Sequence, residues 1–131
     1  MKRIAVTSRS PFEAIIGFSR AVRVGDRVAV SGTAPIAEDG SVAAPGDAYG
    51  QTRRCLEIIE RSLRDAGSGL SDVLRTRVYL SRASAWEGVA RAHAEVFADV
   101  RPASTFVVVG ALLDPEWLVE VEADAVVGGA P

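Results

Sequence analysis

The chain has 131 residues and is 48% hydrophobic, which predicts one domain, residues 1–131, with a complete hydrophobic core. Its 15 Lys and Arg residues nearly balance its 17 Asp and Glu residues, and no basic run with interleaved aromatic residues occurs, so we expect no nucleic-acid partner. No apolar run approaches the length of a membrane span and no secretory leader is evident, so we expect a cytoplasmic protein with no membrane partner.

The first predicted elements form a β-hairpin within residues 20–32, RAVRVGDRVAVSG. Valines alternate with other residues on both sides of a Gly25-Asp26 turn, which is the pattern of two antiparallel strands. The Pro-, Gly- and Ala-rich residues 37–50 then predict a connector.

Two amphipathic helices are predicted, over residues 47–66 and 84–98. Asp47 is suited to cap the start of the first helix and Gly67 to end it. The first apolar stripe contains Thr52, Cys55, Leu56, Ile59, Leu63 and Ala66, and the second contains Trp86, Val89, Ala90, His93 and Phe97.

Three further strands complete the predicted sheet. Residues 74–81 come between the helices, and residues 104–111 and 117–127 follow them, separated by a turn at Asp114-Pro115. The side of residues 74–81 that is expected to face the core carries Leu74, Thr76, Val78 and Leu80. This order of elements predicts an α+β or mixed α/β layer with both helices on one face of the sheet.

The other face of the sheet is predicted to be charged, because acidic residues and arginines recur at alternate positions of two strands. Its members are Glu120, Glu122, Asp124, Arg75 and Arg77, with Arg23 of the hairpin as a further candidate. Since the helices already cover the apolar face, we expect the charged face to pack against another subunit rather than to lie in water.

Several segments occur in one order and spacing between about Ile16 and Val126. They are GFSRAVRVGDRVAVSGTAP (Gly17 to Pro35), Gln51-Thr52 with Leu56, DAGSGLSDVLRTRVYL (Asp65 to Leu80), RPAST (Arg101 to Thr105) and VEVEADAVV (Val119 to Val127). Together they resemble the RidA/YjgF family, also called endoribonuclease L-PSP. The resemblance implies an α+β fold of the chorismate-mutase-like (Bacillus) type and a homotrimer with three ligand clefts between subunits.

In its best-known branch this family hydrolyses 2-imino or enamine acids to 2-keto acids and ammonia, and we expect no cofactor. The resemblance assigns Glu120 as the carboxylate that positions the attacking water; the alternative is an acidic residue paired with Arg75 or Arg77. Phe18 stands where the family has an aromatic hydroxyl, which keeps a stacking surface and loses a donor. The Ser31-Gly32-Thr33 segment keeps the glycine that allows a ligand to approach the backbone.

The chain departs from the family where the substrate-clamping arginine is expected. The motif reads Pro102-Ala103-Ser104-Thr105, so Ser104 occupies the arginine position, and Phe106 replaces a cysteine that often follows. An arginine bound to a carboxylate through two hydrogen bonds contributes about 3 kcal/mol, roughly a hundredfold in affinity, which hydroxyls do not replace.

Two other arginines are candidates for the missing cation. Arg101 lies three residues before Ser104, and along an extended chain its side chain points to the opposite face. Arg20 follows the Gly17 to Ser19 segment that resembles a cleft wall; the competing interpretation is a solvated or interfacial sheet residue.

The remaining single residues favour structural roles. His93, the only histidine, lies on an apolar stripe, which favours a hydrogen-bonded core or interface residue over an acid–base catalyst. Cys55 is expected to be a packed thiol, and Trp86 and Trp117 to be core or subunit-interface anchors. One Cys and one His do not supply a zinc site, and we expect no metal.

We therefore expect a trimer of this family that binds a small molecule between its subunits. If it is an enzyme, it hydrolyses an imine-like or carbonyl-like compound, with Glu120 positioning water and Ser104 and Thr105 orienting the substrate, and free 2-aminoacrylate is a poor substrate. The other candidate ligand contacts are Phe18, Arg20, Ser31, Gly32, Phe106 and Arg101. A noncatalytic trimer that binds a ligand or partner, and an endoribonuclease, remain as alternatives.

Overall fold

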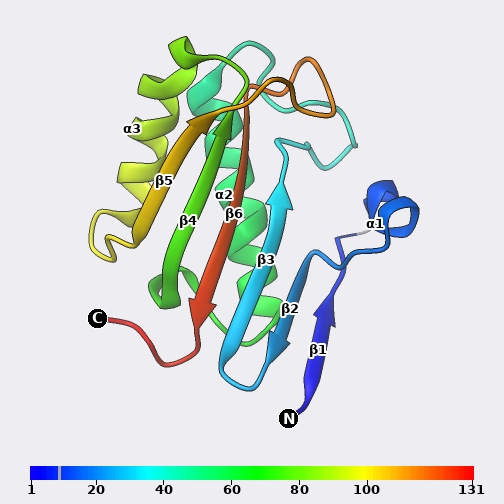
Figure 1. Cartoon of the computed structure of the whole chain (residues 1–131), viewed down its shortest axis with the longest axis vertical. Coiled ribbons are helices and arrows are strands. Elements are labelled where there is room, and N and C mark those ends of the chain that lie inside the picture. The colour runs from blue at the N-terminus through cyan, green and yellow to red at the C-terminus, as the bar shows by residue number, and fades with distance from the viewer. Residues whose placement is uncertain (9) are drawn as a thin grey trace.

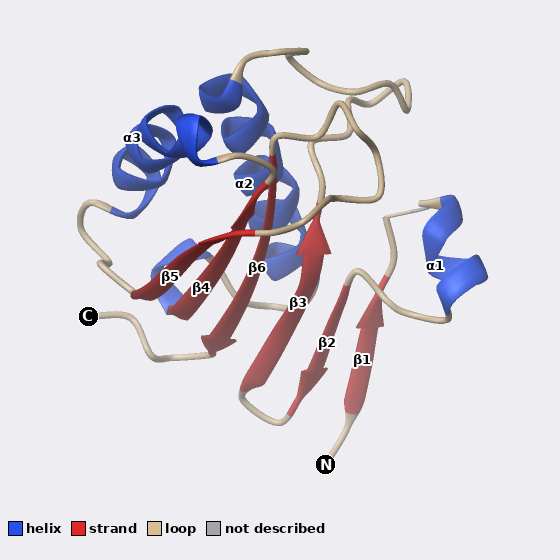
Figure 2. Cartoon of the chain, turned by 45° about the horizontal axis from the view of Figure 1, so that its top comes forward, coloured by secondary structure: helices blue, strands red, loops and turns tan. Residues whose placement is uncertain are grey.

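The computed structural model describes residues 1–8 and 10–131. Its main elements are β1 (Arg3–Val6), α1 (Pro11–Ile16), β2 (Ala21–Val24), β3 (Arg27–Thr33), α2 (Ala48–Asp65), β4 (Val73–Leu80), α3 (Trp86–Phe97), β5 (Ala103–Val108) and β6 (Val119–Val126), with short 3₁₀ turns at Leu70–Asp72 and Ala83–Ala85. The strands form one six-stranded sheet in the order β1-β2-β3-β6-β4-β5. Both α2 and α3 cover the same face of this sheet (Figures 1 and 2), so the predicted α+β layer is confirmed.

The position of β6 determines which residues meet in the middle of the sheet. β2 and β3 form the predicted hairpin, with Ala21 opposite Val30. β6 lies between β3 and β4 and is antiparallel to both, whereas β4 and β5 are parallel. The start of β6 therefore lies beside the end of β3, and β5 is an outer strand (Figure 1).

β1 and α1 were not predicted from the sequence. β1 pairs with β2 and extends the sheet by one strand. α1 is short, but Ser10 and Glu13 form a capping box, Pro11 opens the first turn, and Gly17 ends the helix with φ of 87°. α1 stands beside the sheet at its β1 side, away from α2 and α3 (Figure 1).

The core lies between the sheet and the two long helices. The Asp47 side chain accepts a hydrogen bond from the Gly50 amide and caps α2, as predicted. Fully buried apolar side chains come from both helices and from the central strands: Cys55, Leu56, Ile59, Leu63, Val78, Val89, Val119 and Val121. Among the described residues, neither α2 nor any other helix is long and apolar enough to span a membrane.

Two predictions about individual side chains are wrong. The pairing of β4 with β6 shifts register between Val73 and Arg75, so Leu74 is 60% exposed instead of facing the core. Arg23 does not join the charged face, because it faces the helices and donates to the Ala66 carbonyl oxygen at the end of α2, at 2.9 Å. Trp86 is 55% exposed, so within the chain it is not a core residue, and its alternative role as a subunit-interface anchor stays a prediction.

Candidate functional site

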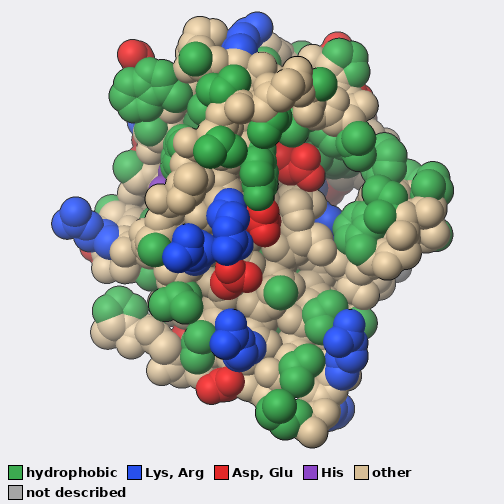
Figure 3. Space-filling view, in the orientation of Figure 1, with side chains coloured by type: hydrophobic (Ala, Val, Ile, Leu, Met, Phe, Trp, Pro, Cys, Tyr) green, Lys and Arg blue, Asp and Glu red, His purple; other side chains and the backbone are tan. Residues whose placement is uncertain are grey.

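The open face of the sheet carries the predicted charges (Figure 3). The Arg77 guanidinium lies 3.2 Å from an Asp124 carboxylate oxygen and 3.6 Å from a Glu122 carboxylate oxygen, and the Tyr79 hydroxyl donates to Glu122. Two of the three acidic residues of β6 are thus paired with groups on β4. Exposed ion pairs of this kind contribute little to stability, about 1 kcal/mol or less, so they mainly order this face.

Glu120, the third acidic residue of β6, is different. Within the described chain its carboxylate has no Lys or Arg at ion-pair distance, although Arg20 interacts with it at longer range. Burial raises the pKa of Glu120. The charge of Arg20 lowers this pKa and the charge of Glu122 raises it, each by a smaller amount. Within the described chain Glu120 pairs with neither Arg75 nor Arg77, so the predicted alternative is not observed.

Gly32 of β3 determines where the Glu120 carboxylate lies. A Cβ atom built on Gly32 would lie 2.7 Å from Glu120 Oε2, closer than real Cβ contacts. Only glycine leaves room for the carboxylate to rest against the backbone of β3. Gly32 was predicted to let a ligand approach the backbone, and in the structure it makes room for the side chain of Glu120.

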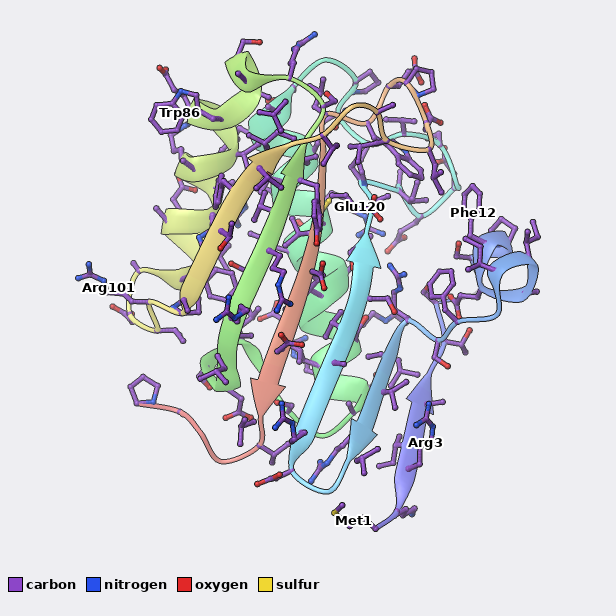
Figure 4. All side chains as sticks on the ribbon, viewed as in Figure 1. Met1, Arg3, Phe12, Trp86, Arg101 and Glu120 are labelled. Atoms are coloured by element: carbon purple, nitrogen blue, oxygen red, sulfur yellow. The ribbon has the colours of Figure 1, made fainter. Side chains whose placement is uncertain are left out.

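Glu120 lines a cavity of about 1130 Å³ at the end of β3. α1, α2 and the segment that precedes β6 contribute the other walls, and Figure 4 shows Glu120 near the tip of β3 with Phe12 of α1 on the far side. The predicted site residues that the cavity brings together are Phe18, Arg20, Ser31, Gly32 and Glu120.

Arg20 lines this cavity and directly follows the Gly17 to Ser19 segment that was predicted to form a cleft wall. It is buried, with 6% of its surface exposed. Its Nη1 donates to Thr33 Oγ1 at 3.2 Å, its guanidinium carbon lies 5.2 Å from the centre of the Phe18 ring, and its Nε has no hydrogen-bond partner among the described residues. The interpretation of Arg20 as a solvated residue is wrong. A buried guanidinium with an unfilled donor is suited to an anionic group.

The β5 residues lie elsewhere. Ser104 and Phe106 face the helices, since Ser104 Oγ is 2.7 Å from Thr76 Oγ1 and the Phe106 ring is 5.6 Å from the His93 ring. Thr105 alternates with them and pairs with Arg77 in the register of β4 and β5, so it belongs to the open face. Within one chain none of the three reaches the cavity, and their roles toward a substrate stay predictions.

Arg101 lies outside the β5 edge of the sheet, away from Glu120 (Figure 4). Its φ of 51° is left-handed, and its amide donates to the Phe97 carbonyl oxygen at the end of α3. The assumption that the chain is extended through Arg101 is therefore wrong. Within one chain, Arg20 is near Glu120 and Arg101 is not.

His93 and Cys55 have the structural contacts that the sequence predicts. His93 Nε2 lies 2.8 Å from Thr76 Oγ1, and its ring lies 4.7 Å from that of Phe97. Cys55 is fully buried, which raises the pKa of its thiol.

The contribution of α1 to the cavity was not predicted from the sequence. Phe12 and Ile16 line it, and the Phe12 ring packs edge-on against Trp117 at 6.3 Å. The signal was present as Ser10-Pro11 followed by Glu13, a helix start that the hydrophobic pattern alone does not reveal. Trp117 is 4% exposed and also lines the cavity, so it is both a core residue and part of a cavity wall.

Comparisons with known proteins agree with this architecture. A family model described as endoribonuclease L-PSP matches residues 8–127. An uncharacterized protein of Streptomyces coelicolor is 41% identical over 120 residues, which cover 92% of this chain and 89% of that protein. The 3-aminoacrylate deaminase RutC of Acinetobacter baylyi is 37% identical over 101 residues, or 77% of this chain and 79% of that enzyme.

A solved structure gives the same result. The crystal structure of Rv2704 from Mycobacterium tuberculosis, a member of the YjgF/YER057c/UK114 family, has a TM-score of 0.87 and 44% identity, and the match covers 96% of this chain and 100% of that one. The fold, the order of the sequence segments and the matched length of this chain all agree with those of the family. The chain therefore belongs to the endoribonuclease L-PSP family, also known as the YjgF or Rid family, as its sequence resemblance implied.

Proposed function

We propose that this protein is a trimeric Rid-family hydrolase that binds a small imine, enamine or related carbonyl compound beside Glu120 and releases ammonia from the C–N substrates. The observation that carries this proposal is the half-buried Glu120 carboxylate, which rests on Gly32 at the wall of a cavity and has no ion-pair partner in the described chain. The kinship with a 3-aminoacrylate deaminase supports the class of reaction.

In the proposed reaction Glu120 accepts a hydrogen bond from a water molecule. The water oxygen attacks the imine carbon, and one proton of the water passes to Glu120 and then to the nitrogen, which gives an amino alcohol. The hydroxyl proton of this amino alcohol then passes through Glu120 to the nitrogen as the C–N bond breaks, so ammonia leaves and a carbonyl product remains. The raised pKa of Glu120 supports this role, because a base whose pKa lies closer to neutrality is more effective at proton transfer.

The substrate range is proposed to differ from that of typical family deaminases. Ser104 stands where the family has its carboxylate-binding arginine, and a neutral hydroxyl forms a weaker bond to a carboxylate. Free 2-aminoacrylate is therefore expected to be a poor substrate, while less anionic imines or carbonyl compounds are expected to be better ones.

The test is release of ammonia from 3-aminoacrylate and 2-aminoacrylate, each generated in the assay, by the purified protein. Glu120→Gln is expected to abolish turnover above background, whereas Glu87→Gln, at an exposed position on α3, is the matched control and keeps full activity. Rapid deamination of 2-aminoacrylate that is lost in Glu120→Ala would show that another cation replaces the missing arginine. Unchanged turnover in Glu120→Gln would refute the proposed role.

A noncatalytic trimer that binds a ligand or partner is the second candidate, and the missing arginine favours it. Crystals soaked with small carboxylates and carbonyl compounds distinguish the two: a ligand beside Glu120 favours a working cleft, and a cleft filled by side chains favours an interaction module. Cleavage of RNA by the pure protein, abolished by a cavity substitution, would support the endoribonuclease alternative instead.

The trimer is itself part of the proposal, as is the assignment of residues 1–131 to one domain in a cytoplasmic protein. The charged open face and the outer strand β5 are the surfaces expected to meet another copy. Light scattering is expected to report three times the chain mass of 13.8 kDa. A stable monomer at micromolar concentration would contradict the assembly.

A further inference from the structure

Two buried side-chain nitrogens in the described part of the chain have no hydrogen-bond partner, Arg20 Nε and Trp117 Nε1. Both residues line the cavity beside Glu120, and they are 6% and 4% exposed. Buried polar groups in native proteins nearly always have a partner, and each group without one needs an explanation. Two unfilled donors on residues of one cavity wall indicate that the cavity receives a group with a hydrogen-bond acceptor.

The same cavity contains an acceptor, the Glu120 carboxylate, which has no ion-pair partner in the described chain. The charges of Arg20 and Glu120 shift each other's pKa, although the two groups do not come within ion-pair distance. The backbone explains why they are close, because the Ser31 amide donates to the Arg20 carbonyl oxygen at 3.0 Å and the next residue, Gly32, supports Glu120. A small ligand group is suited to bridge the two side chains.

The charges of the inner cavity wall favour a neutral ligand. Arg20 alone would attract an anion, but the half-buried Glu120 carboxylate opposes one, and for a cation the two effects are reversed. The other charged residues of the lining lie toward solvent or are already paired: Glu38, Glu57, Arg61 and Asp65 are exposed, and Arg54 binds the Ile36 carbonyl oxygen and Glu57. A neutral group that accepts at one end and donates at the other leaves the two inner charges balanced.

A primary carboxamide has this arrangement of polar atoms. Its carbonyl oxygen carries two lone pairs and its nitrogen carries two hydrogens. The oxygen suits the donors of Arg20 and Trp117, and the nitrogen suits the carboxylate of Glu120. The remaining wall suits a small hydrocarbon body, because it carries Phe12, Ile16 and Phe18.

We propose that the Glu120 cavity recognises a neutral carboxamide on a small apolar body, with Arg20 and Trp117 donating to its carbonyl oxygen and Glu120 accepting from its nitrogen. This inference deepens the proposed function, on which it rests for the location of the ligand, by naming the polar group that a substrate carries in place of a carboxylate. An ionised carboxylate accepts about four hydrogen bonds, so Glu120 keeps acceptor positions for the attacking water.

The experiment compares butyramide, butyrate and butylammonium, three ligands of similar size, with the intact protein at about pH 8, well above the ordinary range of a Glu carboxyl. The NMR signals of the indole N–H groups report binding, and Trp86→Phe assigns the signals of the two tryptophans. Butyramide is expected to shift the Trp117 signal saturably, in the millimolar range for so small a ligand, and to leave the Trp86 signal unchanged. Butyrate and butylammonium are expected to bind about tenfold more weakly or worse.

Two substitutions test the assigned contacts. Arg20→Gln, if it folds, is expected to weaken butyramide binding about tenfold or more, because a charged donor is lost. Glu120→Gln is expected to reverse the preference, because the charge that opposes butyrate is gone while the new side chain still accepts from the amide nitrogen. Glu87→Gln, at an exposed position on α3 outside the cavity lining, is the matched control and keeps the wild-type order of affinities.

The outcomes separate this inference from the proposed hydrolysis. No saturable shift of the Trp117 signal with butyramide would show that the donors are satisfied within the assembly and would overturn the inference. Tighter binding of butyrate or butylammonium to the wild type would also overturn it, since one charge would then act alone. A preference for butyramide without ammonia release from 3-aminoacrylate would count against hydrolysis and leave this inference standing. Ammonia release that Glu120→Gln abolishes, in a protein without that preference, would do the reverse.

Discussion

Replacement of Gly32 by Ala is expected to displace the Glu120 carboxylate while the fold stays intact. The new Cβ atom would lie 2.7 Å from Glu120 Oε2, and ordinary contacts begin at 3.4 Å, so the oxygen has to move by about 0.7 Å. The obstructed atom is the end of a flexible side chain, and for this reason the strand itself need not shift.

Gly32→Ala is expected to change the stability of the protein little and its catalytic rate strongly. Ala is preferred over Gly inside a strand by about 0.5–1 kcal/mol, which stabilises the variant. A Glu side chain forced from its preferred rotamer costs about 0.5–1.5 kcal/mol. The net change in the free energy of unfolding is therefore expected to stay within about 1 kcal/mol of zero. For catalysis, a misplacement approaching 1 Å costs on the order of a hundredfold in rate. Gly32→Ala should therefore be a folded protein with little activity.

Urea unfolding at a fixed protein concentration measures the first quantity, and ammonia release from 3-aminoacrylate measures the second. Gly69→Ala is the control, because a Cβ at Gly69 has no atom within 4 Å. In a Glu120→Ala background the clash disappears, so Gly32→Ala is expected to stabilise the protein by about 0.5–1 kcal/mol. Full activity in Gly32→Ala, or the same stability change in both backgrounds, would refute this reasoning.

Three further predictions concern titration and packing. The raised pKa of Glu120 means that its ionisation destabilises the folded state. The stability of Glu120→Gln relative to wild type should therefore increase as pH rises above the ordinary Glu range. A constant difference in urea unfolding between pH 4 and 8 would contradict this. The buried Cys55 thiol, whose pKa is raised, should react with a disulfide reagent only after unfolding, and rapid labelling of the native protein would show that α2 is loosely packed. Leu80 is 3% exposed and Leu74 is 60% exposed. In urea unfolding, Leu80→Ala should therefore cost about 2–5 kcal/mol and Leu74→Ala less than about 1 kcal/mol. Equal costs would contradict the register shift in β4.

The sequence alone determined the local elements and their faces. The alternation of β6 predicted that Val119 and Val121 face the helices and that Glu122 faces outward, because successive side chains of a strand point to opposite faces. Apolar spacing predicted α2 to within one residue at each end, and Asp47 supplied its cap. These features depend on the geometry of consecutive residues, which the sequence contains.

The tertiary structure decided what those elements bring together. Insertion of β6 between β3 and β4 placed Glu120 over Gly32, residues far apart in the chain, and no local pattern encodes this neighbour. The register shift in β4 exposed Leu74, and a left-handed backbone at Arg101 broke the expected extended path, since both depend on pairing and helix termination rather than on alternation.

The candidate site divides in the same way. The sequence and its family resemblance identified the candidate site residues. Only the fold showed that Arg20 lines the cavity of Glu120, whereas Arg101 lies outside the β5 edge of the sheet. The link from Ser104 through Thr76 to His93 joins β5, β4 and α3. Side chains on three elements meet because the sheet and helices pack in three dimensions, and their spacing along the chain gives no measure of that distance.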